Sequence, residues 1–305
     1  MLASLDSTAL PHDRRLNARI QQWVREAGLT ERWSAQQLGG LHIDFVVDAA
    51  FPRVPMRGRV LAAAWILLFC AIDDLADGDG LSPQQLRAQL DELRRALSGQ
   101  SPERPQNLLE RACARFFRSI RSEDPRRLET FHRRIGTLFD TYVEEATMHR
   151  DGIEPGLARY LQLRRTTSGM PAIFSLFPLL TGLPFPEMRP ELRELEMWAS
   201  DLVGWENDLR TVDKERGTSS GNLVFVLEGS HGMSSPDALR VATSMFEQRQ
   251  REFSARANTL LEPHHDASTR LYASMLVSCV QAHHDWAQVT GRYDPPTPER
   301  WEPAA

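Results

Sequence analysis

Three aspartates follow the most apolar stretch of the chain, residues 60–72. Asp73 and Asp77 are four residues apart, so on a helix their carboxylates project from one face, with Cβ atoms about 5–6 Å apart. Asp74 is rotated by about 100° from Asp73 and is expected to be a supporting ion-pair or hydrogen-bond partner. Carboxylates late in a helix oppose its dipole, and a divalent cation would compensate them. For this segment alone, an ordinary polar helix end is the alternative.

A second segment aligns three hard oxygen ligands on one helix face. Asn207, Thr211 and Glu215 stand at four-residue intervals, and their amide, hydroxyl and carboxylate oxygens suit Mg²⁺. A surface helix of mixed polarity is the alternative. Lys214, the one lysine among 36 basic residues, directly precedes Glu215. Its ammonium could reach a bound phosphate as a point charge, or it could be a solvated surface residue.

Together the two segments resemble the paired metal motifs of class I terpene synthases. The first resembles the aspartate-rich motif of that family. The second resembles its Asn/Ser/Glu motif, with Thr211 in the serine position. The continuation from Lys214 through Gly217 to Asn222 also resembles the bacterial branch of the family.

Two further segments extend the resemblance. By the family pattern, Arg165 is the diphosphate sensor, Ser168 the linker and Gly169 the effector. Near the C-terminus, Arg292 and Tyr293 resemble the Arg-Tyr pair that contacts diphosphate when the active site closes. Ser168 departs from the family pattern, which often has Asp there, and a charge-assisted link to the sensor is therefore weakened.

The resemblance implies an all-α, single-domain helical bundle of the class I terpenoid synthase type. Such an enzyme ionises a linear prenyl diphosphate and cyclises the carbocation to a hydrocarbon or alcohol. The implied cofactor is Mg²⁺, with three ions in all. The implied metal ligands are Asp73, Asp77, Asn207, Thr211 and Glu215, supported by Asp74. The implied diphosphate contacts are Arg165, Lys214, Arg292 and Tyr293, and the implied catalytic residues are Arg165, Ser168, Gly169 and Phe69.

The carbocation needs apolar walls that exclude water and aromatic faces that stabilise positive charge. Phe69 is the best candidate, because it lies one turn before Asp73 on the same face. Aromatic residues at helical spacing are more commonly core, and this is the alternative for the other candidates. Those candidates are Trp65, Trp198, Trp205 and Phe174. Cys70 stands where an aromatic can accompany Phe69 in the family.

Farnesyl diphosphate is the leading substrate because of its frequency in the family, and geranylgeranyl diphosphate stays open. A prenyl-chain elongating transferase would be expected to carry two aspartate-rich motifs, whereas the second motif here is Asn/Thr/Glu. A non-catalytic helical scaffold would leave both acidic helices as solvated faces. The pairs His264–His265 and His283–His284 make no zinc pattern, because adjacent helical side chains diverge. We interpret them as solvated or capping residues.

The composition fits a soluble globular protein, with 41% hydrophobic and 25% charged residues. A net charge of -5 argues against a nucleic-acid partner. Residues 60–72 are too few to span a membrane, and residues 1–14 lack the features of a signal peptide. Three widely spaced cysteines are interpreted as reduced core thiols. We therefore expect a cytoplasmic protein without stable membrane insertion, and a homodimer is left open.

Helical periodicity is found almost throughout the chain, with no sustained alternation typical of strands. We expect one domain over residues 1–305, with a Pro-rich tail at 294–305. Pro171, Pro178 and Pro184–Pro186 predict a kinked or interrupted region between two helices. The expected helices are 16–29, 61–75, 83–97, 107–120, 127–149, 156–165, 186–212, 236–261 and 267–289.

Overall fold

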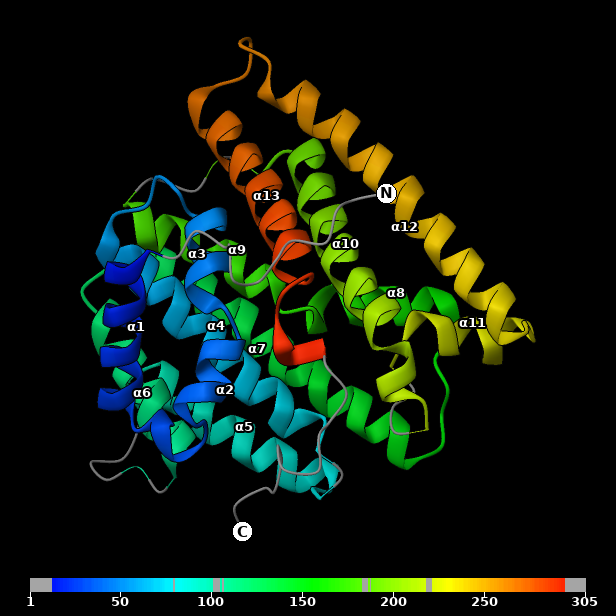
Figure 1. Cartoon of the computed structure of the whole chain (residues 1–305), viewed down its shortest axis with the longest axis horizontal. Helices are drawn as coiled ribbons and strands as arrows, with labels where there is room; N and C mark the ends of the chain where they lie inside the picture. Colours follow the sequence, from blue (N-terminus) through cyan, green and yellow to red (C-terminus); the bar gives the residue numbers. More distant parts are fainter. Residues whose placement is uncertain are drawn as a thin grey trace.

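The computed structural model describes residues 13–78, 80–100, 105, 107–182, 186, 188–217 and 221–293, so the expected tail at 294–305 lies outside the described residues. Within the described part, the regular elements are helices without strands, which confirms the predicted all-α class (Figure 1). The helices are α1 (Arg14–Ala27), α2 (Ala35–Gly40), α3 (Ile43–Ala50), α4 (Met56–Ala76), α5 (Pro83–Leu97), α6 (Leu108–Ile120), α7 (Pro125–Arg150), α8 (Leu157–Thr167), α9 (Met170–Thr181), α10 (Pro190–Glu215), α11 (Leu223–His231), α12 (Ser235–Leu261) and α13 (Ala267–Trp286). Two short 3₁₀ helices, η2 (Leu29–Glu31) and η3 (Gly291–Tyr293), complete them.

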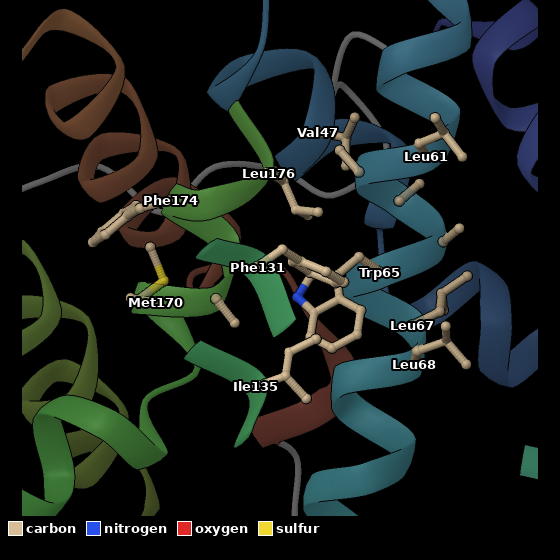
Figure 2. Close-up of a cluster of buried hydrophobic side chains, with 14 of the residues drawn as sticks. Val47, Leu61, Trp65, Leu67, Leu68, Phe131, Ile135, Met170, Phe174 and Leu176 are labelled. Atoms are coloured by element: carbon tan, nitrogen blue, oxygen red, sulfur yellow. The ribbon is translucent and has the colours of Figure 1, made fainter. Parts of the chain in front are cut away.

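Helix α4 is apolar on nearly every side because other helices surround it. It packs against α1, α3, α6, α7 and α9. Its central side chain, Trp65, is fully buried, and the ring centroids of Phe116 and Phe131 lie 5.6 and 5.0 Å from its own. Figure 2 shows the Trp65 indole pointing from α4 toward Phe131 and Ile135 of α7. Trp65 is therefore a core residue.

The sequence did not predict α9. Of the expected kinked or interrupted region, the interruption is wrong for residues 170–181, where the chain forms a helix with Pro178 in its interior. An interior proline costs a helix about 3 kcal/mol because it removes one backbone hydrogen bond. Most residues of α9 are buried against α4, α7 and their neighbours, and this packing outweighs the cost.

Helix α10 carries the second polar segment and packs against α8, α12 and α13 (Figure 1). The first polar segment ends α4. The two segments thus lie at the C-terminal ends of two different helices. None of the helices in the described part of the chain combines the length and apolarity that a membrane span needs.

The position of Trp65 yields a stability prediction. Trp65→Ala should lower the free energy of unfolding by about 3–5 kcal/mol, because it leaves a large void in a filled core. Trp198→Ala is the matched control and should cost less, since Trp198 is only half-buried. Urea unfolding of both variants measures the difference. Equal losses at the two positions would contradict the assignment of Trp65 to the core.

Candidate active site

A cavity of about 830 Å³, a volume that includes its opening to solvent, lies among α3, α4, α8, α9, α10 and α13. Most of its lining is apolar. Charge and hydrogen-bonding capacity come from a smaller set of side chains. These polar lining residues are Asp73, Arg164, Thr167, Ser168, Asn207, His283, Arg292 and Tyr293.

Asp73 and Asp74, near the end of α4, both form ion pairs with Arg292. Nη2 of Arg292 is 2.8 Å from Oδ2 of Asp73, and its Nη1 is 3.3 Å from Oδ1 of Asp74. The Tyr142 hydroxyl donates to Oδ1 of Asp73 at 2.9 Å. Arg32 forms a second ion pair with Asp74 at 3.3 Å. Asp73 lines the cavity, whereas Asp74 is tied to two arginines and is not part of the lining.

The polar face of α10 is connected to the same cavity through Asn207. Its Oδ1 accepts a hydrogen bond from Arg164 at 2.7 Å, and its Nδ2 donates to the Tyr293 hydroxyl at 3.2 Å. One turn further along, the buried Thr211 hydroxyl donates to the Asn207 backbone carbonyl at 2.9 Å. That bond uses the hydroxyl hydrogen and leaves oxygen lone pairs as acceptors.

Glu215 ends α10 and is held by the start of α11. The Nδ2 of Asn222 donates to Oε2 of Glu215 at 3.0 Å and to the backbone carbonyl of Asp208 at 2.9 Å. Asp208 itself is buried and forms an ion pair with Arg164 at 2.8 Å. These contacts fix the end of α10 and the position of the Glu215 carboxylate.

The segment η3 joins the two helix ends. Arg292 contacts the aspartates of α4 through its side chain, and its backbone carbonyl accepts a hydrogen bond from Lys214 at 3.1 Å. Tyr293 contacts Asn207. Lys214 is exposed and is not part of the cavity lining. The two segments predicted from the sequence are therefore brought together, with Arg292 and Tyr293 between them.

Arg164, which was not predicted from the sequence, lies in the cavity lining where Arg165 was expected. Arg165, the residue expected to sense diphosphate, does not line the cavity in this conformation. Its guanidinium instead pairs with the fully buried Asp201, with N–O distances of 2.6 and 3.2 Å. Arg164, the preceding residue, lines the cavity and contacts Asn207. The adjacent arginines could not be assigned by motif alone, because they project about 100° apart on a helix.

Phe69 and Gly169 are in close contact, which requires a glycine at position 169. Gly169 has a φ of +72° at the start of α9, and a Cβ built on it would lie 2.2 Å from the Phe69 ring. Only glycine allows both that backbone conformation and such a close approach. Phe69 lines the cavity, so Gly169 fixes the position of part of its wall. The neighbouring Ser168 hydroxyl donates to the Arg165 carbonyl at 3.0 Å.

The other aromatic residues expected in the wall lie elsewhere. Phe174 and Trp65 are fully buried in the main core, and Trp205 is buried in a second cluster with α11 and α12. Trp198 contacts the guanidinium groups of Arg249 and Arg256. These positions correct the sequence-based expectation, since none of the four residues is part of the lining. The aromatic residues of the lining are Phe51, Phe69, Trp286 and Tyr293.

The interpretation of His283 and His284 as solvated or capping residues is wrong. Both contact Glu206, through Nδ1 of each ring, at 3.2 and 2.8 Å respectively. Burial alone would raise the pKa of Glu206, but His283, Arg210 and His284 outweigh it and lower that pKa to about 2. His283 also lies 3.4 Å from the Tyr293 hydroxyl and lines the cavity. Only the fold reveals this cluster, because Glu206 and the histidines are far apart in sequence.

The two segments suit a hard divalent cation. Their donor atoms are carboxylate, amide and hydroxyl oxygens, the type that Mg²⁺ prefers. Burial raises the pKa of Glu145 on α7 to about 7, where Arg164 opposes the rise and the charge of Asp73 adds to it. Glu145 is therefore close enough to Arg164 and Asp73 for their charges to shift its pKa. Among the described residues, no three His, Cys, Asp or Glu side chains form a ready metal cluster. Asp77 is exposed at the end of α4.

Comparison with known proteins identifies the family. Residues 64–252, more than half of the chain, match the family described as terpene synthase family 2, C-terminal metal binding. The chain belongs to this terpene synthase family. It is therefore an enzyme of terpene cyclisation that acts on a prenyl diphosphate and uses a divalent metal.

Relatives are found among bacteria and fungi. The chain is 25% identical, over 93% of its length and 90% of the relative's, to a (+)-T-muurolol synthase ((2E,6E)-farnesyl diphosphate cyclizing) of Roseiflexus castenholzii. It is 26% identical to sesquiterpene synthase 6 of Postia placenta, over 83% of this chain and 76% of that protein. Its fold matches 2-methylisoborneol synthase from Streptomyces coelicolor with a TM-score of 0.81 and 20% identity, over 99% of this chain and 97% of that one.

The contact between Phe69 and Gly169 yields a second prediction. Gly152→Ala should cost about 1–2 kcal/mol of stability, because Gly152 has a φ of +64° and open space around it. Gly169→Ala should cost more and should also impair turnover, since the new methyl group displaces Phe69. Chemical unfolding and steady-state rates of both variants measure the two effects. If both variants retain wild-type turnover, Phe69 is not fixed by Gly169.

Proposed function

We propose that the protein is a Mg²⁺-dependent sesquiterpene cyclase, a carbon–oxygen lyase that converts farnesyl diphosphate to a cyclic terpene and releases diphosphate. The observation that carries this proposal is the convergence of three features on one apolar cavity. These are Asp73 of α4, Asn207 of α10, and the Arg292–Tyr293 segment.

The metal ligands that we propose are Asp73, Asn207, Thr211 and Glu215, with Asp77 as a further candidate from the exposed end of α4. Bound Mg²⁺, which we propose as three ions, supplies positive charge that stabilises the departing diphosphate. Asp74 supports Asp73 by holding Arg292 and Arg32 in place.

The leaving diphosphate must be neutralised in a place with little water. Arg164, Arg292 and Tyr293 line the cavity and can donate to its oxygens, so we propose them as the direct protein contacts. Lys214 reaches the same segment through the Arg292 carbonyl. Arg165 stays a predicted contact, which would require it to leave Asp201.

The carbocation that remains needs the opposite environment. Apolar side chains from several helices exclude water, and the faces of Phe51, Phe69 and Trp286 can stabilise positive charge. Farnesyl diphosphate is supported by the Roseiflexus relative, which is described as cyclising that substrate. Three unpaired, buried cysteines support a reducing compartment, and we propose the cytoplasm as the location.

Removing ligands from α10 tests the metal site. In the double variant Asn207→Leu, Glu215→Leu, the rate of diphosphate release should fall by more than the roughly 10–100-fold that loss of an outer-shell partner costs. The matched control is Asp213→Leu, an exposed carboxylate on the same helix end, which should leave the rate unchanged. Diphosphate release from farnesyl diphosphate is measured with Mg²⁺, with chelator, and after Mg²⁺ is restored. Full turnover by the folded double variant would contradict the proposed ligands.

A further inference from the structure

Of the two histidines bound to Glu206, one faces the cavity. His283 lines it, whereas His284 contacts the same carboxylate and is not part of the lining. We propose, on the basis of the proposed function, that His283 is the base that removes the final proton from the carbocation. The enzyme would then release a hydrocarbon rather than an alcohol.

Hydrogen bonding selects the ring nitrogen that can accept the proton. Glu206 is buried and paired with Arg210 at 2.9 Å, and its Oε2 lies 3.2 Å from Nδ1 of His283. A carboxylate oxygen only accepts, so Nδ1 of His283 carries the hydrogen, and in the neutral ring Nε2 has the lone pair that can accept a proton. The Tyr293 hydroxyl is 3.4 Å from Nε2, a distance at the long end of hydrogen bonding. Nε2 is therefore only weakly engaged.

The other polar groups of the lining are poorer bases. Burial raises the pKa of the Cys70 thiol to about 11 and that of Cys279 to about 12, so both stay protonated. Asp73 already bonds to Arg292 and Tyr142, and we assign it to the metal site. Amides and hydroxyl groups are weaker bases than imidazole. Within the described lining, this leaves His283.

The proposed proton transfer needs no reactant other than the carbocation and His283. A C–H bond next to the cationic carbon breaks, its electron pair forms the new C=C bond, and the proton moves to Nε2 of His283. Glu206 stabilises the resulting imidazolium through Nδ1, as a carboxylate does for a catalytic histidine in other enzymes. The imidazolium then returns its proton to the released diphosphate or to solvent.

Paired variants separate this role from a structural one. His283→Asn keeps an N–H group that can reach Glu206 but has no basic nitrogen, and His284→Asn is the matched control. Each full-length protein is given farnesyl diphosphate and Mg²⁺, and diphosphate release and extracted products are measured in parallel. For His283→Asn, the rate of main-product formation should fall by about 100-fold or more, the usual contribution of a positioned base. Diphosphate release should continue, because ionisation precedes deprotonation, and other products should replace the main one.

Each result has a clear meaning. An unchanged product profile for His283→Asn, an equal change for His284→Asn, or an alcohol as the main wild-type product would overturn the role of His283. If His283→Asn does not fold, as judged by thermal unfolding, His283→Gln is tested by the same criteria. Absence of diphosphate release by the wild-type protein from C10, C15 and C20 substrates would instead contradict the proposed function itself.

Discussion

The Arg292 guanidinium lies between Asp73 and Asp74, two carboxylates whose negative charges are disfavoured by their position. Both carboxylates stand in the last turn of α4, where the helix dipole opposes them. An apolar cavity borders Asp73, so water alone does not compensate the charge. The chain meets this constraint with cations from distant segments, and the ion pairs join the C-terminal segment to the rest of the bundle. A site that already needs positive charge is suited to Mg²⁺ and to an anionic substrate.

The apolar part of the site follows from how the helices pack. Helix α4 is buried on nearly every side, so Phe69 can project into the cavity one turn before Asp73. Gly169 lets the start of α9 approach the Phe69 ring without a side chain between them. The same few residues therefore set the cavity wall and its distance from the charged groups. We infer that the contacts around Phe69, Asp73 and Gly169 position both the place where diphosphate leaves and the place where the cation reacts.

Local patterns predicted much of this structure, and long-range contacts supplied the rest. Four-residue spacing was enough to place Asn207, Thr211 and Glu215 on one face of a helix, and the all-α class followed from periodicity. Pro178 misled the prediction because burial of α9 outweighs the helix-breaking tendency of proline. Spacing could not show which of two adjacent arginines lines the cavity. It also could not show that Glu206 contacts His283, because residues far apart in sequence meet only through the fold.

The central claim is that the ends of α4 and α10 form two halves of one metal–diphosphate site. A crystal structure with Mn²⁺ and inorganic diphosphate, recorded at a wavelength where manganese scatters anomalously, tests it most directly. We predict anomalous peaks bonded to Asp73 on one side and to Asn207, Thr211 and Glu215 on the other, with diphosphate between them and in contact with Arg292. Peaks that avoid either helix end, or diphosphate bound away from Arg292, would contradict the account.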